Sequence, residues 1–245
     1  MNRCWSQRWH WYPFLAITVA GLWLWPVQQG RPMGLKPAEI PAGEFRMGTL
    51  DGTKEERPVH AVWVDTFVID PAEVTNRDYE AFRPKHRRSL LSSCDQCPVT
   101  LVTWFEADAY CRNRGERLPT EAEWEKVARG PEGWNYSFGQ QPDPGLGRFG
   151  EQFQTGAVEV FSFRPNGYGA YQMSGNVWEW TTDWFGRYPK GPVKNPKGPA
   201  TGFQKVVRGG SWYNPAYFVH VGMRFKLRPE MKINSVGFRC AHDIF

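Results

Sequence analysis

Glycine and proline interrupt this sequence so often that long regular elements are not expected. The 245 residues include 25 glycines and 20 prolines, which mark turns and break helices. Aromatic residues account for 16% of the chain, with 13 tryptophans, and hydrophobic residues for 41%. That apolar share is enough for a substantial core and excludes wholesale disorder. We therefore predict a loop-rich fold packed around indole rings rather than a helix bundle.

The charge pattern gives no indication of a nucleic-acid partner. Lysine and arginine number 30 against 25 acidic residues, so the net charge is only +5. These charges are dispersed along the chain rather than clustered, whereas nucleic-acid binding requires a basic patch. We expect no nucleic-acid binding.

The first thirty residues differ in character from the rest. Arg3 and Arg8 precede an apolar run over residues 9–27, which is either a cleaved signal peptide or a retained membrane anchor. No pattern of small residues suited to cleavage follows the run, and Cys4 precedes it, so it is not a lipoprotein cysteine. We favour an uncleaved single transmembrane helix. Because the arginines keep the N-terminal end in the cytoplasm, the remainder is expected on the extracytoplasmic, periplasmic side of the cell membrane.

The rest of the chain is predicted to be one domain. Residues 1–30 form the anchor or signal segment, residues 31–39 a linker, and residues 40–245 the domain. Residues 40–47 and 59–64 alternate as short strands do. Three short helices are predicted where a threonine is followed three residues later by an acid. These pairs are Thr75 with Asp78, Thr103 with Glu106, and Thr120 with Glu123.

Several segments resemble the formylglycine-generating enzyme family, also called the sulfatase-modifying factor family. They appear in the family's order and span most of residues 40–241. They are IPAGEFRMGT (40–49), VDTFVIDPAEVTNRDYEAF (64–82), PVTLVTWFEADAYCRNRGERLPTEAEWEKVARG (98–130), PNGYGAYQMSGNVWEWTTDWF (165–185), VVRGGSW (206–212) and GFRCA (237–241). RLPTEAEWE and GNVWEW are highly specific strings. The resemblance implies an α+β domain that is a variant of the C-type lectin fold and is low in regular secondary structure. In this chain the domain is preceded by the one predicted N-terminal transmembrane helix.

The resemblance also implies a structural calcium ion. The ligands would be the Gln172 side chain, the backbone carbonyls of Gly175 and Val177, and the Glu179 carboxylate. Calcium accepts hard oxygen ligands of these kinds. The family usually has Asn or Asp where Gln172 stands. The alternative is that Glu179 pairs with an arginine such as Arg208 or Arg239, but we favour calcium.

A second calcium site of the family is expected to be absent. It usually begins with an Ala-Asn pair, and the corresponding stretch here is Gly147-Arg148-Phe149. An arginine cannot ligate a cation.

Four cysteines of the domain are assigned to two pairs. Cys111 and Cys240 match a pair that is disulfide-bonded in similar exported proteins, and such a bond would contribute roughly 4–5 kcal/mol. Cys94 and Cys97 form a CDQC motif in an insert outside the family pattern. This motif is a redox dithiol, half of a metal site or a disulfide that staples the loop, and we favour the last. No histidine follows it, which excludes covalent haem attachment, and a single CxxC cannot form a zinc ribbon without outside ligands.

The catalytic cysteines of the family are missing. In formylglycine-forming members, two cysteines follow the RGGS serine by three and eight residues and hold a copper ion. The serine here is Ser211, and the corresponding positions are Asn214 and Val219. Neither side chain can supply the soft thiolate that Cu(I) requires. We therefore expect neither copper nor catalytic residues, while a groove beside Ser211 and Trp212 would still accept a peptide.

Two classes of function follow. We favour a non-catalytic accessory, maturation or complex-subunit protein that binds a protein or peptide, rather than an enzyme. The alternative is an oxygen-dependent oxidoreductase of the formylglycine-generating or non-haem-iron type, acting on a cysteine-containing peptide or a small molecule. An iron site would need two histidines and a carboxylate, yet the candidates His60, His86, His220 and His242 show no ligand spacing. True formylglycine generation would need an unrecognised centre, such as Cys94 with Cys97.

Overall fold

The computed structural model describes Met1 and residues 36–244. The predicted anchor over residues 9–27 and Cys4 lie outside the described residues. Within the described part of the chain, no helix is both long and apolar enough to cross a membrane. Residues 36–244 belong to one compact unit.

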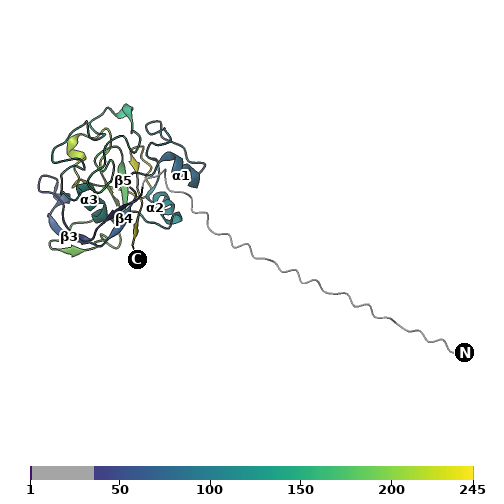
Figure 1. Cartoon of the computed structure of the whole chain (residues 1–245), viewed down its shortest axis with the longest axis horizontal. Helices are drawn as coiled ribbons and strands as arrows, with labels where there is room; N and C mark the ends of the chain where they lie inside the picture. Colours follow the sequence, from purple (N-terminus) through teal and green to yellow (C-terminus); the bar gives the residue numbers. More distant parts are fainter. Residues whose placement is uncertain (2–35, 245) are drawn as a thin grey trace. The chain divides into compact units, whose positions relative to one another are not determined.

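Three small sheets form the framework of the domain (Figure 1). The first has the order β1-β4-β10 and is antiparallel, with β1 Ala38–Ile40, β4 Phe67–Ile69 and β10 Ala241–Asp243. The second pairs β2 Gly43–Met47 antiparallel with β3 His60–Val64, which runs parallel to β6 Val193–Lys194. The third has the order β8-β7-β5-β9, with β8 Arg224–Leu227, β7 Lys205–Arg208, β5 Trp178–Trp184 and β9 Val236–Gly237.

The structure confirms the three predicted helices, each capped by its threonine. They are α1 Asn76–Phe82, α2 Trp104–Asn113 and α3 Glu121–Arg129. Thr75, Thr103 and Thr120 each accept a hydrogen bond from the backbone three residues on. The reciprocal bond of a capping box is present in α2 and α3. The remaining helical pieces are the 3₁₀ turns η1 Lys54–Glu56, η2 Phe153–Thr155 and η3 Ala216–Phe218.

Two apolar clusters hold the sheets and helices together. One packs α1 and α2 against the four-stranded sheet through aromatic side chains that include Tyr79, Tyr110, Trp180 and Phe238. The other packs α3, through Trp124, against the two smaller sheets. Figure 1 accordingly shows α3 on one side of β5 and both other helices on the opposite side. The expectation of a loop-rich α+β fold packed around indoles is confirmed in these described residues.

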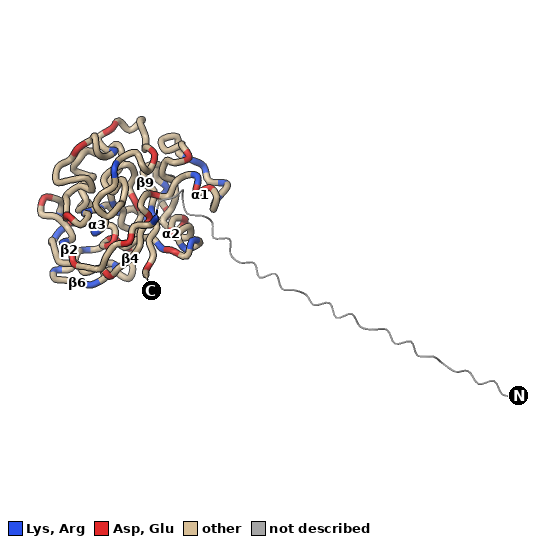
Figure 2. The backbone as a smooth tube through the Cα atoms, viewed as in Figure 1, with Lys and Arg blue, Asp and Glu red and all other residues tan. Residues whose placement is uncertain are grey.

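Charges of both signs alternate over most of the domain, as expected (Figure 2). One segment departs from this pattern. Residues 83–88, which follow α1, read RPKHRR. The charge is therefore dispersed overall but concentrated in one loop, a detail that the composition averages out.

Candidate functional site

The turn that follows β7 leads into Asn214 and lies against Val219, the two positions that the family resemblance assigns to cysteines. Gly209 and Gly210 both have positive φ, at 97° and 74°. A Cβ atom on Gly210 would lie 2.5 Å from Cγ1 of Val219 and 2.6 Å from the Phe218 carbonyl oxygen. Glycine is therefore required here on two counts, because the backbone is left-handed and the neighbouring segment leaves no room. As a result, the turn packs at Gly210 against the segment that carries Val219.

Asn214 acts as a hydrogen-bond acceptor at the centre of this region. Its Oδ1 atom accepts hydrogen bonds from the Ser211 backbone N–H at 2.9 Å, from the Ser211 hydroxyl at 2.7 Å and from the Trp178 indole N–H at 3.0 Å. Its backbone carbonyl accepts from the Gly150 N–H at 2.8 Å. Asn214 thus connects the RGGS turn to Trp178 of β5 and to the loop that contains Gly150.

Val219 is enclosed in a small apolar cluster. It is fully buried and packs with Phe138 and Phe149. The rings of Phe138 and Phe149 are stacked, with centroids 6.1 Å apart. Asn214 thus presents an amide oxygen that already accepts three hydrogen bonds, and Val219 presents a buried isopropyl group. Neither group is a ligand for Cu(I).

Ser211 and Trp212 do not line an open groove, contrary to the expectation from sequence. Both side chains are fully buried, because the Ser211 hydroxyl binds Asn214 and the Trp212 indole donates to the Phe153 carbonyl at 2.9 Å. Exposed aromatic rings lie in neighbouring segments instead. Phe153 is 45% exposed and packs edge-on against Tyr213, with ring centroids 5.2 Å apart, and Tyr217 in η3 is also 45% exposed. We call Phe153, Tyr213 and Tyr217 the aromatic rim.

The candidate histidines do not gather around a common point. His60 stacks on Tyr188, and His86 lies against Tyr79. The Nε2 atom of His220 lies 3.5 Å from a carboxylate oxygen of Glu56. Burial, followed by the charge of Arg208, lowers the pKa of His220 to about 4, so this imidazole is neutral near pH 7.

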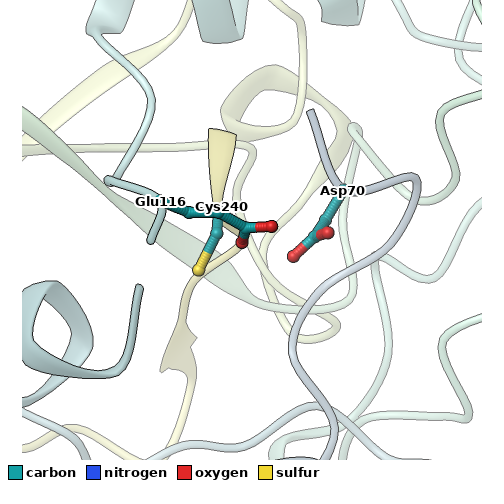
Figure 3. A group of neighbouring side chains, drawn as sticks. All are labelled: Asp70, Glu116 and Cys240. Atoms are coloured by element: carbon teal, nitrogen blue, oxygen red, sulfur yellow. The ribbon is translucent and has the colours of Figure 1, made fainter. Parts of the chain in front are cut away.

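One cluster of residues resembles a metal site but is an ion-pair network. Among the described residues, Asp70, Glu116 and Cys240 alone bring three such ligand atoms within 4.8 Å of one another (Figure 3). Cys240 is bonded to Cys111. Both terminal nitrogens of Arg114 donate hydrogen bonds to the Asp70 carboxylate, at 2.9 and 3.0 Å. The Nε atom of Arg114 also lies 3.1 Å from a carboxylate oxygen of Glu116. The Nδ1 atom of His242 lies 4.0 Å from Glu116. The described cluster thus has one histidine nearby and not the two that a two-histidine, one-carboxylate iron site would need.

The expected calcium ligands fit a cation only in part. Gln172 is 5% exposed, and its side-chain carbonyl oxygen has no hydrogen-bond partner within the described structure. An orphaned buried acceptor of this kind suits a cation. Glu179, in contrast, accepts hydrogen bonds from Arg239 on both oxygens, at 2.7 and 2.8 Å, and from Trp124 at 2.9 Å. Its charge is thus already balanced by Arg239, which is the alternative drawn from sequence.

The second family site holds a guanidinium group instead of a possible ligand. Arg148 donates to Glu151 at 2.8 Å and to the Gly156 carbonyl at 3.3 Å. Its own carbonyl accepts from the Asn176 N–H at 2.7 Å. The positive side chain therefore performs a bracing role between loops.

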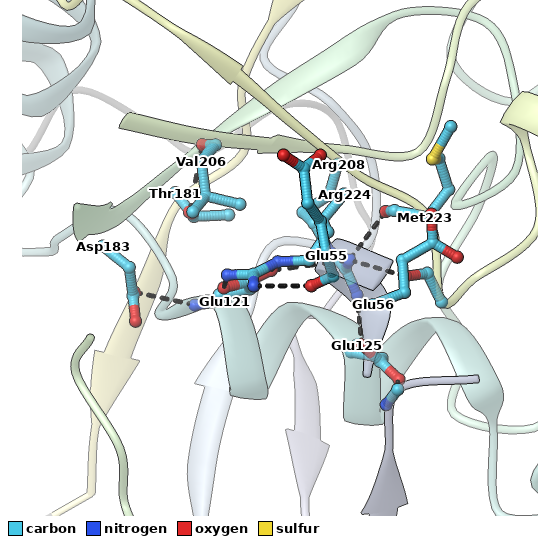
Figure 4. A network of polar contacts seen from close by, with 12 residues as sticks. Glu55, Glu56, Glu121, Glu125, Thr181, Asp183, Val206, Arg208, Met223 and Arg224 are labelled. Atoms are coloured by element: carbon cyan, nitrogen blue, oxygen red, sulfur yellow. Dashed lines mark hydrogen bonds and ion pairs between the residues drawn. The ribbon is translucent and has the colours of Figure 1, made fainter. Parts of the chain in front are cut away.

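A buried charge network joins α3 to the four-stranded sheet (Figure 4). Arg208 on β7 is fully buried; it donates to Glu125 and to the Met223 carbonyl at 2.6 Å. Arg224 on β8 donates hydrogen bonds to both carboxylate oxygens of Glu121, at 2.6 and 2.8 Å. Burial acts to raise the pKa of Glu125, but the neighbouring Arg129 and Arg208 lower it below its ordinary value. The helix is thus held by paired charges as well as by Trp124.

Both disulfides expected from the sequence are formed. Cys111 on α2 is bonded to Cys240 just before β10, and Cys94 is bonded to Cys97 in the insert. Sequence reasoning missed the acceptor role of Asn214 and the network of Arg208 with Glu125. The one sequence signal that could have predicted this acceptor role is that Asn214, a polar residue close to cysteine in size, stands at a position that the resemblance assigns to a cysteine.

Comparison with known proteins identifies the family. The Sulfatase-modifying factor enzyme 1-like domain matches residues 28–244, and the chain belongs to this family. It is 32% identical to the formylglycine-generating enzyme of Streptomyces coelicolor, over 89% of this chain and 93% of that protein. It is 30% identical to the inactive C-alpha-formylglycine-generating enzyme 2 of Bos taurus, over 94% and 95%.

The fold has a close counterpart among solved structures. Treponema denticola variable protein 1 superposes with a TM-score of 0.76 at 24% identity, covering 84% of this chain and 94% of that one. At this level of identity the similarity establishes the fold alone. The relatives of this chain include a protein named formylglycine-generating enzyme and one named inactive. Family membership alone therefore does not decide whether this chain is an enzyme, and the geometry of its site has to be considered.

Proposed function

We propose that this chain is a non-catalytic member of the family that binds a protein or peptide partner, as an accessory, maturation or complex-subunit protein. Asn214 carries the proposal. Its amide oxygen accepts three hydrogen bonds at the position where active members need a thiolate. The second position, Val219, is sealed in an apolar cluster. The rigid scaffold, a variant of the C-type lectin fold, is kept without the copper ligands.

The aromatic rim supports a binding role. Phe153 and Tyr217 are each 45% exposed, and Phe153 lies against the buried Trp212 with ring centroids 6.2 Å apart. Exposed aromatic side chains are enriched where proteins bind partners. Tyr213 of the rim lies in the turn that Asn214 organises, and the Phe153 carbonyl accepts a hydrogen bond from the Trp212 indole at 2.9 Å. These two rings are therefore attached to hydrogen-bonded backbone.

The absence of catalysis is tested by incubating the purified protein with copper, oxygen, a thiol reductant and a cysteine-containing peptide of the sulfatase type. We expect no aldehyde above the no-enzyme control. Aldehyde formation that is lost on mutating Cys94 and Cys97 would overturn the proposal. So would stoichiometric copper or iron in the purified protein, which would favour the oxidoreductase alternative.

The binding role is tested with the full-length protein isolated in mild detergent. We expect companions identified by mass spectrometry to be lost from the Phe153→Ser/Tyr217→Ser variant. Phe203→Ser is the matched control, because Phe203 is 94% exposed and is not part of the rim. Companions that are lost equally from both variants, or from neither, would contradict binding at the rim.

Anchoring by residues 9–27, with the domain on the periplasmic side, belongs to the same proposal. It is supported by the apolar run and its flanking arginines. N-terminal sequencing of membrane-extracted protein should find the run still attached. A mature start near residues 28–31 would show that it is cleaved.

A structural calcium ion is proposed at Gln172 and the carbonyls of Gly175 and Val177, with Glu179 nearby. Its support is the orphaned Gln172 oxygen. Gln172→Ala is the better test, because Glu179→Gln would also break the buried pair with Arg239. We expect a chelator to lower the melting temperature of the parent protein but not of Gln172→Ala. Equal chelator sensitivity in both proteins would exclude Gln172 as a ligand.

A further inference from the structure

The two disulfides differ in their access to solvent. Cys111 and Cys240 are both fully buried, whereas Cys94 is only half-buried and its partner Cys97 is 6% exposed. Disulfide exchange requires a thiolate to reach one sulfur atom of the bond. The Cys94–Cys97 bond is thus the one that a second molecule can approach, through the side chain of Cys94.

The shape of the CDQC loop is held by hydrogen bonds that do not involve sulfur. The Asn76 N–H donates to the Cys97 carbonyl at 2.9 Å, and the Asn76 side chain donates to the Cys94 carbonyl at 2.9 Å. The next amide, of Arg77, donates to the Asp95 carbonyl at 3.1 Å. The start of α1 thus fastens three of the four residues of the motif. Reduction of the bond would therefore leave two thiols facing each other on Cα atoms about 5.0 Å apart.

Two guanidinium groups lie close to Cys94. Arg88 donates to the Ser93 carbonyl at 2.8 Å and pairs with Asp95 at 2.8 Å, and Arg77 lies 3.8 Å from the same carboxylate. Arg88 also donates to both carboxylate oxygens of Glu80 at 2.6 Å, so these two arginines meet two acids. Lys85 and Arg87 have no ion-pair partner in the part of the chain that the structure describes, and Figure 2 shows this basic loop beside α1. Positive charge beside a cysteine stabilises a thiolate and attracts an approaching one.

We propose that the Cys94–Cys97 bond exchanges with a cysteine pair of another polypeptide and oxidises it. A substrate thiolate attacks Sγ of Cys94, forms a mixed disulfide and releases Cys97 as a thiolate. The second substrate thiolate then attacks the mixed disulfide and releases Cys94. The substrate gains a disulfide, the chain gains two thiols, and both substrate protons end on these thiols or in solvent. A low-molecular-weight disulfide, itself reduced to two thiols, restores the bond. This activity is independent of the proposed binding function.

Access is tested on the full-length protein in mild detergent, in buffers of reduced and oxidised glutathione. After alkylation and peptide mass spectrometry, we expect Cys94 and Cys97 to be reduced and reoxidised reversibly. The buried Cys111–Cys240 bond is the internal control and should stay oxidised. If both bonds resist reduction until the protein unfolds, the proposal is overturned.

The direction of attack is tested with two single variants and oxidised glutathione as the probe. We expect Cys97→Ser, which leaves Cys94 free, to form the mixed disulfide at least tenfold faster than Cys94→Ser. A folded state is verified for each variant by its melting curve and by an intact Cys111–Cys240 bond. Equal rates in the two variants would contradict the assignment of Cys94 as the reacting sulfur. A reduced two-cysteine peptide should in turn be oxidised by the parent protein and not by either variant.

Discussion

At the scale of single residues, one amide side chain organises the turn that follows β7. The Oδ1 atom of Asn214 accepts hydrogen bonds from the backbone and hydroxyl of Ser211 and from the indole of Trp178. The position that the family resemblance assigns to a cysteine therefore has a structural role in this chain.

Asn214→Ala should lower the free energy of unfolding by about 1–3 kcal/mol, because it leaves three donors without their acceptor. Asn214→Asp keeps an oxygen in the same place and should lose less. Chemical denaturation of the two variants measures the difference. An equal loss in both would mean that the hydrogen bonds to Oδ1 are not what stabilises the turn.

A second residue predicts how stability depends on pH. Burial, followed by the charge of Glu121, raises the pKa of Asp183 to about 7 from an ordinary value of 3.8. Between these values the folded state keeps a proton that the unfolded state has lost. The contribution of Asp183 to the free energy of unfolding therefore decreases as the pH rises from about 4 to 7.

Asp183→Asn removes this titration while its amide oxygen can still accept from the Glu121 N–H, at 2.8 Å in the parent. Guanidinium denaturation at several pH values should give a shallower decline for the variant between pH 4 and 7. The exposed Asp143→Asn serves as the control. A parallel decline in the parent and Asp183→Asn would show that another group titrates.

At the scale of elements, the sequence predicted helices better than it predicted their attachments. The threonine caps of α1, α2 and α3 are local signals, since each involves residues three positions apart. The ion pair between Glu125 of α3 and Arg208 of β7 spans 83 positions. No local pattern contains such a pair, which depends on how the chain closes in three dimensions.

Glu125→Gln should destabilise the protein by about 3–5 kcal/mol, because it removes the closest counter-charge of the buried Arg208 and the carboxylate that pairs with Arg129. Glu151→Gln is a matched control. Glu151 and its partner Arg148 are partly exposed, with 38% and 20% of their side-chain surface open to solvent. A solvent-exposed ion pair contributes about 1 kcal/mol or less. Equal effects of the two substitutions in thermal or chemical denaturation would contradict a special role for the buried network.

Long-range packing, which local sequence patterns do not contain, also explains why the groove predicted at Ser211 and Trp212 is not formed by these two side chains. The two glycines before Ser211 indicate a turn, and both have positive φ. The exposure of a side chain, however, is a property of the packed molecule. Phe153, far away in sequence, supplies the carbonyl that holds the Trp212 indole. The aromatic rim could therefore not be predicted from the RGGSW segment alone.

At the scale of the whole molecule, one disulfide ties distant parts of the domain together. Cys111 and Cys240 are separated by 129 positions, so their bond removes far more freedom from the unfolded chain than the bond between Cys94 and Cys97. Cys111→Ser/Cys240→Ser should cost about 5 kcal/mol in the chain-entropy model, and Cys94→Ser/Cys97→Ser roughly 2 kcal/mol. Denaturation of both double variants gives the ranking. A larger loss from the insert pair would contradict it.

The long bond also sets an order of events while the protein is being made. Synthesis at 5–20 residues per second means that Cys240 appears roughly 6–26 s after Cys111. During that interval Cys111 is an unpaired thiol, and Cys94 and Cys97 are the other cysteines of the domain that have already been made. Early closure of the short CDQC ring removes both of them from competition for this thiol. The insert would thus protect the newborn chain from mispairing until strand β10 arrives and the correct bond can close.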